Sequence, residues 1–377
     1  MLAGLSAAGH RAFLVAPVDP SRFDLRAVGD ALSAWCEPRL VPAAPAPPFS
    51  ALLRAARDRA PLSIARHTLP AVRREVERCL GEKSFDLVHA EQLQALPQAA
   101  PAFARGLPVV LRAQNVESDL WREAARRRGG VRGALLKIEA RRLARWEGAA
   151  VRRAALTLAL TAEDAARLRE LAGGGNVAVL RAPFPELPAA AGERLPGEPA
   201  VVVLGSQGWV PNEEGVAWFL GDVWPAVAAA LPSAVLHLFG AAAAGALPPR
   251  AILHPAPRES TEAFRPGAVL AVPLRIASGV RMKVLEAWAR GAPVVGTPAA
   301  LAGLEVIDGR EALVAADAAS FVRAFARLHG EPGLAGHLIA EGHRARRERH
   351  DPSRITADLL AAYAALSIRR RRDNAGR

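Results

Sequence analysis

Two cations and one carboxylate lie close together on a single predicted helix, at residues 280–290. Arg281 and Lys283 fall in its first turn, and Glu286 follows on the same helix. A helix N-terminus already carries partial positive charge and free N–H donors, so cations placed there oppose the helix dipole. They become favourable where an anion docks, because the N–H groups and the cations then act together. The spacing therefore indicates a phosphate site, with Glu286 placed behind it to accept hydrogen bonds from ribose hydroxyls. A solvated surface with Arg, Lys and Glu is the alternative.

The elements that would hold this site are predicted around the helix. A short apolar run at Ala268–Leu274 is typical of a buried parallel strand, and a loop of small residues follows it. Ser278 is the candidate N-cap, and Gly291 stands where a glycine ends a helix. The run Ala292–Gly296 predicts the next buried strand.

A second group of polar residues follows two buried strands in the first half of the chain, predicted at Phe85–Ala90 and Pro108–Ala113. Ligands of open α/β sheets bind at the carboxyl ends of the strands, so the polar residues there are site candidates. They are His89, Glu91, Gln114, Asn115 and Glu117. His89 alone also fits a buried histidine with its hydrogen bonds satisfied.

Composition limits the classes of protein that need to be considered. A chain of 377 residues predicts two domains, each with its own core. The net charge of +12 favours anionic surfaces or substrates, but no zinc-finger spacing or basic-aromatic pattern indicates nucleic acid. Cys36 and Cys79 are isolated, which fits a reducing cytoplasm. No apolar run is long enough for a membrane span, and the start lacks a signal-peptide pattern.

The first half is predicted to form one α/β domain, at residues 1–185. It opens on a helix at Leu2–Gly9 and a strand at Ala12–Pro17, whereas such a domain normally opens on a strand and a glycine-rich turn. A first strand and its loop are therefore expected to be missing. The remaining predicted elements, in chain order, are a connector at Leu40–Pro48, helices at Ala51–Arg59 and Thr68–Leu80, a basic helical region at Arg122–Arg153, a strand at Ala155–Leu160, a helix at Ala162–Leu171 and a strand at Val177–Leu180.

The second half repeats the strand and helix alternation. A linker rich in Pro, Ala, Gly and Glu is predicted at residues 186–199, and a second domain at 200–352. The strand Ala200–Leu204 closes on Gly205-Ser206, and a loop leads through Asn212 into a helix that Pro225 kinks or splits. A helix is expected at 353–368 and a basic disordered tail at 369–377.

The basic region Arg122–Arg153 has two interpretations. Its many arginines would suit an anionic membrane or a charged acceptor. They equally suit a solvated face in a protein that uses arginine in place of lysine, since the chain has only three lysines.

Several segments together resemble the family 4 (group 1) glycosyltransferases. VVVLGSQGWVPNEEGVAWFLGDVWPAV is similar to the opening of that family's C-terminal domain, and VPLRIASGVRMKVLEAWARGAPVVGTPAALAGL is similar to its nucleotide-sugar segment. DGREALV resembles the next strand, while FDLVHAEQ and VVLRAQNVES resemble strand ends of the acceptor domain. The resemblance covers nearly the whole chain. It implies the GT-B fold, in which two Rossmann-like α/β/α domains face each other across a cleft, and a final helix that crosses back to the first domain.

The resemblance also implies an activity and a set of site residues. The expected reaction moves a sugar from a nucleotide-sugar donor to a glycan or lipid-linked acceptor, with retention at the anomeric carbon and without a metal or cofactor. Arg281 and Lys283 would hold the diphosphate and stabilise the leaving phosphate. Glu286 matches the second glutamate of the family's Glu-seven residues-Glu motif, which holds the ribose. The remaining expected donor contacts are Gly205, Ser206, Asn212, Arg275, Ser278 and Gly279.

The chain departs from the family pattern at several positions. Ser278 occupies the place of the motif's first glutamate. A subset of the family, with a Ser-Gly-x-Arg-x-Lys loop, has the same departure. Gln114 stands where the acceptor domain often has histidine, and Arg181-Ala182-Pro183 replaces a usual Pro-Asn-Gly. The expected loss of the first strand would remove a loop that faces donor and acceptor.

Three functions remain open on the sequence. The first is a glycosyltransferase that makes a polysaccharide or glycolipid in the cytoplasm, peripheral on the inner membrane face. The second is a non-catalytic GT-B protein that binds a nucleotide sugar. The third is a nucleotide-sugar 2-epimerase, which would need more carboxylates and histidines at the cleft than His89 and Glu91 supply.

Overall fold

The computed structural model describes residues 1–205, 210–240, 246–276 and 279–375, and it divides into two compact units. The first unit comprises Met1–Pro183 together with Pro352–Arg377, and the second comprises Phe184–Asp351. Residues 186–199, predicted as a linker, belong to the second unit, where the Ala190 N–H donates to the Arg290 carbonyl at 3.0 Å.

All the strand pairs of the first unit are parallel, within two separate sheets: β1-β2, and β3-β4-β5-β6 in that order. The elements of this unit are α1 (Leu2–Ala7), β1 (Phe13–Val18), α2 (Leu25–Ser33), β2 (Glu37–Pro42), α3 (Pro48–Arg57), α4 (Leu62–His67), α5 (Pro70–Glu82), β3 (Val88–Glu91), η1 (Leu93–Ala99), α6 (Ala100–Ala104), β4 (Val109–Ala113), α7 (Glu117–Arg127), α8 (Gly130–Arg153), β5 (Leu156–Ala159), α9 (Ala162–Ala172), β6 (Val177–Val179) and α16 (Pro352–Ala375).

The structure corrects the prediction of a connector at Leu40–Pro48. Its first residues complete β2, which pairs with β1 in a register that places Leu14 opposite Pro38. A proline cannot donate to a sheet ladder, so two prolines in six residues argue against a strand in the sequence. They are tolerated here because β2 pairs with one neighbour only, within the described residues. Helix α2 was not predicted either.

Within the described residues, β1 pairs only with β2, and β3 pairs only with β4.

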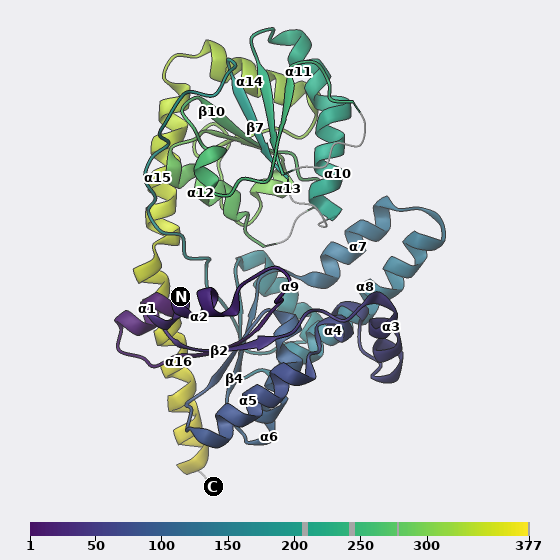
Figure 1. Cartoon of the computed structure of the whole chain (residues 1–377), viewed down its shortest axis with the longest axis vertical. Coiled ribbons are helices and arrows are strands. Elements are labelled where there is room, and N and C mark those ends of the chain that lie inside the picture. The colour runs from purple at the N-terminus through teal and green to yellow at the C-terminus, as the bar shows by residue number, and fades with distance from the viewer. Residues whose placement is uncertain (206–209, 241–245, 277–278, 376–377) are drawn as a thin grey trace. The chain divides into compact units, whose positions relative to one another are not determined.

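Helix α16 is part of the core of the first unit and lies along it in Figure 1. Its buried residues Ile355, Leu359 and Leu366 join a cluster with Val110 and Leu158 of the sheet. The helix continues as far as Ala375, where a disordered tail was expected from residue 369.

The second unit is built on one parallel six-stranded sheet with the order β12-β11-β10-β7-β8-β9 (Figure 1). Its described elements are β7 (Ala200–Leu204), α10 (Val210–Trp218), η2 (Phe219–Val223), α11 (Trp224–Ala230), β8 (Val235–Phe239), β9 (Ala251–His254), η3 (Ser260–Glu262), β10 (Ala268–Val272), α12 (Met282–Arg290), β11 (Val294–Gly296), α13 (Pro298–Leu301), β12 (Leu313–Val314), α14 (Ala318–Gly330) and α15 (Leu334–His350).

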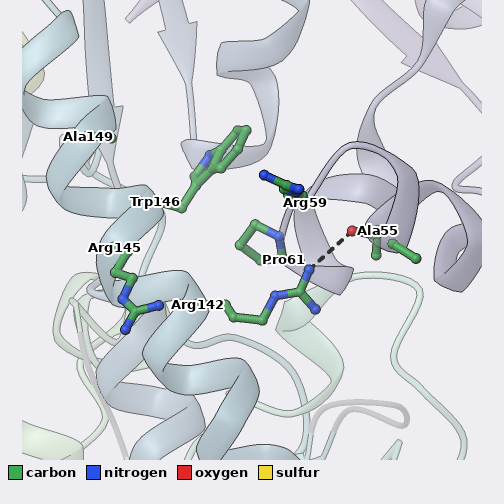
Figure 2. Close-up of a pocket in the computed structure, with 8 residues that line it drawn as sticks. Ala55, Arg59, Pro61, Arg142, Arg145, Trp146 and Ala149 are labelled. Atoms are coloured by element: carbon green, nitrogen blue, oxygen red, sulfur yellow. Dashed lines mark hydrogen bonds between the residues drawn. The ribbon is translucent and has the colours of Figure 1, made fainter.

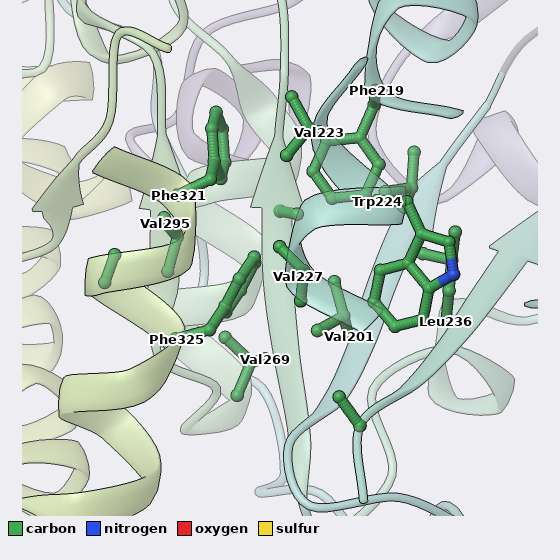
Figure 3. Packing of buried hydrophobic residues seen from close by; sticks show 14 of the residues in the cluster. Val201, Phe219, Val223, Trp224, Val227, Leu236, Val269, Val295, Phe321 and Phe325 are labelled. Carbon is green, nitrogen blue, oxygen red and sulfur yellow. The ribbon is translucent and has the colours of Figure 1, made fainter. Parts of the chain in front are cut away.

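Aromatic side chains fill the core between the sheet and helices α11 and α14. Figure 3 shows Phe219 and Trp224 on one side of this cluster and Phe321 and Phe325 on the other. The predicted break at Pro225 is confirmed: η2 is a π-helical turn in which the Trp224 N–H donates to the Phe219 carbonyl, and α11 starts immediately afterwards. The wider turn accommodates a proline that cannot continue the α-helical ladder.

Helix α12 begins slightly later than predicted. Arg281 is its N-cap residue and makes no side-chain cap hydrogen bond, while Ser278, the predicted cap, lies outside the described residues. The predicted end is confirmed, because Gly291 follows the last helical residue and adopts the left-handed conformation, with φ +73, that glycine allows. Helix α15 packs on α12, and Gly342 of α15 lies against Trp288 of α12.

We predict that Gly342→Ala destabilises the second unit. A Cβ at Gly342 would lie 2.4 Å from Cδ1 of Trp288, which is itself buried. Relieving this overlap costs about 1–3 kcal/mol, measured as the free energy of unfolding in urea. Gly336→Ala on the same helix is the matched control, since a Cβ there meets nothing within 4 Å. It should stabilise the helix by up to about 1 kcal/mol. Equal stabilities of the two variants would contradict the packing described here.

Candidate functional site

Lys283 is the centre of the candidate site in the second unit. Its ammonium Nζ donates to the backbone carbonyl of Leu204 at 2.8 Å and to Oδ1 of Asn212 at 3.2 Å. Leu204 is the last residue of β7, Asn212 is buried near the start of α10, and Lys283 lies in the first turn of α12. These two bonds therefore join three elements at the carboxyl end of a central strand.

The surroundings of Lys283 shift its titration. Burial, and to a smaller extent the positive charge of Arg281, lower the pKa of Lys283 to about 8. A bound anion would raise this pKa again, because its negative charge favours the protonated ammonium. The site is thus electrostatically suited to an anionic ligand.

Backbone donors add to these cations. The first helical bonds of α12 run from Val284 and Leu285 back to the Arg281 carbonyl, so the N–H groups of the preceding residues have no intrahelical acceptor. Gly205 follows β7 directly, and its N–H donates to the Phe239 carbonyl at 2.7 Å. Gly240, with φ +65, passes so close that a Cβ would lie 3.3 Å from the Gly205 carbonyl oxygen.

The other predicted donor residues fall into two groups. Arg275 is exposed and its guanidinium lies 5.3 Å from the ring centroid of Trp218, and Gly279 adopts φ +72. Ser206 and Ser278 lie outside the described residues. The contacts of all these residues with a donor stay predictions.

Glu286 has a structural contact as well as its predicted one. Its Oε1 accepts a hydrogen bond from Nε of Arg290 at 3.1 Å, and Nη2 of Arg290 donates to Oγ of Ser260 at 2.9 Å. Arg290 is buried, so this pair fixes the orientation of the Glu286 carboxylate. A carboxylate can accept further hydrogen bonds through Oε2.

In the first unit, Glu91 is the centre of a second polar network. Its carboxylate accepts from Nε2 of Gln114 at 2.8 Å and lies 3.4 Å from both Nε2 of His89 and Nη1 of Arg112. Burial would raise the pKa of Glu91, but the His89 hydrogen bond and the Arg112 charge outweigh it and lower that pKa to about 2. The structure thus brings together His89, Glu91 and Gln114, while their role as site residues stays a prediction.

This network extends to α16. Nδ1 of His89 lies 2.6 Å from the hydroxyl of Tyr363, whose pKa is raised by burial and then by the charge of Glu91. Sequence reasoning missed Tyr363 and Arg112. Tyr363 is far from His89 in the chain, so periodicity holds no signal for their contact; the one clue was that Tyr363 is the only tyrosine of the sequence. Arg112 meets Glu91 because the two residues are opposite each other in the pairing of β3 with β4.

Glu117 belongs to a different part of the unit. Its carboxylate accepts from Nε2 of Gln94 at 3.1 Å, while its backbone N–H donates to Oε1 of Glu147 at 2.7 Å. Glu147 also accepts the Ser118 N–H at 3.1 Å, so a buried carboxylate of α8 caps the N-terminus of α7. Burial raises the pKa of Glu147 to about 7. Asn115 lies in the half-buried turn just before α7.

The described residues lack two further features. No group of three or more His, Cys, Asp or Glu side chains is arranged there to hold a metal ion. Nor does that part of the chain contain a helix with the length and apolar character of a membrane span.

Residues 198–331, most of the second unit, match the sequence model of the family described as Glycosyl transferases group 1. The second unit is a group 1 glycosyltransferase domain. No curated protein sequence matches the chain.

Solved structures resemble this glycosyltransferase over almost its whole length. HepE from Anabaena in complex with UDP-glucose superposes with a TM-score of 0.62 at 15% identity, covering 97% of this chain and 94% of HepE. Sucrose-phosphate synthase from Thermosynechococcus elongatus gives 0.70 at 16% identity, covering 97% and 91%. These likenesses confirm the predicted α/β class and the GT-B fold.

We predict that Glu91→Gln lowers the stability of the glycosyltransferase at neutral pH but not in acid. The pKa of Glu91 is lowered in the folded state, so its ionised form adds stability above the unfolded value of 4.5, and this is lost as pH falls from there towards about 2. Because the side chain is 41% exposed, solvent screening limits the effect to about 1 kcal/mol. Urea unfolding at pH 7 and pH 3 measures it; the Glu91→Gln penalty should shrink at pH 3. A penalty independent of pH would indicate that the charge of Glu91 is unimportant.

Proposed function

We propose that this glycosyltransferase moves a sugar from a nucleotide-sugar donor to a glycan or glycolipid acceptor, with retention at the anomeric carbon and without a metal. The observation that carries the proposal is the position of Lys283, held by Leu204 and Asn212 at the carboxyl end of β7 in a domain that matches the family. The complexes of HepE with UDP-glucose and with UDP support a nucleotide-sugar donor.

In this proposal the donor diphosphate binds at the N-terminus of α12. Lys283, Arg281 and the N–H groups of the first turn receive its negative charge. When the bond between C1 of the sugar and the phosphate oxygen breaks, charge accumulates on the leaving nucleoside diphosphate, and these groups would stabilise it. The acceptor hydroxyl oxygen forms the new bond to C1 on the face that the phosphate leaves, and its proton passes to the departing phosphate oxygen.

The remaining predicted contacts have distinct roles. Glu286, oriented by Arg290, would accept hydrogen bonds from the ribose through Oε2. Gly205 would border the phosphates beside the end of β7. His89, Glu91 and Gln114 would contact the acceptor from the first unit. The free thiols of Cys36 and Cys79 are consistent with a cytoplasmic reaction, which we propose takes place at the inner membrane face.

One observation favours a second candidate function, a non-catalytic protein that binds a nucleotide sugar. Gln114 and Arg112 donate to the Glu91 carboxylate, and Nδ1 of His89 contacts the Tyr363 hydroxyl, so several of these polar groups are engaged within the first unit. Such a protein would keep the phosphate site of the second unit and lack turnover.

The first experiment is the melting temperature of the full chain with UDP, GDP, ADP and TDP and with the matching nucleotide sugars. We expect one base to raise the melting temperature, because a ligand that binds only the folded state stabilises it. Turnover of the corresponding nucleotide sugar, followed as release of nucleoside diphosphate, then separates the two functions. Binding without release in the presence of glycan and lipid acceptors would favour the non-catalytic protein, and no shift with any nucleotide would contradict both.

We predict that nucleotide affinity falls as pH rises through about 8, because Lys283 must be protonated to hold the diphosphate. The fall should approach tenfold per pH unit in titration calorimetry between pH 7 and pH 9.5. Lys283→Arg should remove this dependence, since arginine stays charged throughout. Lys283→Ala should weaken binding by about 1–3 kcal/mol at pH 7. If the wild type, Lys283→Arg and Lys283→Ala all showed the same pH dependence of nucleotide affinity, a group other than Lys283 would be responsible for it.

A further inference from the structure

Helix α3 exposes an apolar face that its position in the fold does not explain. Phe49, Leu52 and Leu53 are 73%, 57% and 58% exposed, and Ala56 continues the same face at helical spacing. The opposite side of the helix is the buried one, with Ala51 and Ala55 in the core. A helix with both faces apolar usually has a partner on each.

Helix α8 carries a matching stripe. Val131, Leu135 and Ile138 are 78%, 61% and 54% exposed, at spacings of four and three residues that keep them on one side of the helix. The same spacing continues through Arg142, Arg145 and Ala149. Glu139, Leu143 and Glu147 lie on the buried side, against the rest of the first unit.

A cavity of about 400 Å³ lies between the helices, and it is lined by residues that continue the two stripes, Ala56 of α3 and Arg145 and Ala149 of α8. Figure 2 shows Arg142, Arg145, Trp146 and Ala149 of α8 on one side of this cavity, with Ala55, Arg59 and Pro61 on the other. Nη2 of Arg142 donates to the Ala55 carbonyl at 3.1 Å, which ties α8 to the end of α3. The apolar stripes and the cavity form one continuous surface, which we call the α3–α8 face.

The charges of this face are positive. Arg59 and Arg145 are exposed at the cavity, and Arg59 adopts φ +50, a costly conformation for a residue with a side chain. Lys137 and Arg141 are exposed beside the α8 stripe. Two acidic residues of this region are paired with arginines: Asp58 with Arg57 at 2.7 Å, and Glu139 with Arg142 at 3.5 Å.

We propose that the α3–α8 face docks the protein on an anionic membrane. The exposed apolar side chains of both helices would enter the interfacial layer, and Arg59 and Arg145 would hold a lipid phosphate at the cavity, beside the indole of Trp146. Apolar residues bordered by arginines are the combination that anionic lipid surfaces select. Two copies of the chain would meet like charge with like charge on this face, which favours the membrane over self-association. The proposal does not depend on sugar transfer.

The test is co-sedimentation of the full chain with vesicles of phosphatidylcholine alone and of phosphatidylcholine with phosphatidylglycerol. We expect binding to the anionic vesicles and much weaker binding to the neutral ones. Arg59→Gln/Arg145→Gln should weaken anionic binding by about 30-fold, at roughly 1 kcal/mol per arginine. Leu53→Ser/Leu135→Ser should weaken it by about tenfold or more through lost apolar burial. These side chains are exposed, so both variants should fold, as circular dichroism would verify.

The matched control is Ile307→Ser/Arg323→Gln, which changes an exposed apolar residue and an exposed arginine of the second unit. It should bind vesicles as the wild type does. Failure of the wild type to bind anionic vesicles would overturn the proposal, as would equal losses in the control and the test variants. So would light scattering in which the wild type is a dimer and Leu53→Ser/Leu135→Ser a monomer, because the face would then bind a second copy.

Discussion

The hydrogen bonds of the Lys283 ammonium are the contacts on which the candidate donor site depends. The carbonyl of Leu204 and the side chain of Asn212 hold Nζ between the end of a strand and the starts of two helices. A buried cation at a helix N-terminus opposes the helix dipole and raises the energy of the empty site, and burial with Arg281 nearby lowers its pKa to about 8. An anion removes both penalties. The parallel sheet makes this possible, because its strands deliver β7 and the loop after β10 to the same edge.

In the first unit, the polar residues are held by a carboxylate, Glu91, rather than by a cation. Glu91 is surrounded by donors from β3, β4 and the turn after β4, and His89 connects the network to Tyr363 of α16. The last helix of the chain thus becomes part of the first unit through apolar packing and through one buried polar contact. Glu147 of α8 connects two helices of the same unit, because its carboxylate accepts backbone N–H groups at the start of α7 that have no acceptor within that helix.

The cation of the candidate donor site and the cations of the α3–α8 face differ in their burial. Lys283 is enclosed and has two oxygen partners, which suits a single phosphate ligand bound with defined geometry. Arg59 and Arg145 are exposed beside apolar side chains, which suits a diffuse anionic surface. The arginine-rich composition alone does not separate the two, whereas the burial of each cation does.

The sequence by itself determined the α/β class, most strands and helices, the glycine at the end of α12 and the break before Pro225, because local periodicity and backbone chemistry carry these signals. It also placed Lys283 and Glu91 at strand or helix ends. It did not predict β2, whose prolines are tolerated only at a sheet edge, or the cap of α7 by Glu147. Tertiary structure alone decided that Lys283 meets Asn212 and that His89 meets Tyr363, since residues distant in sequence become neighbours only when the core brings their elements together.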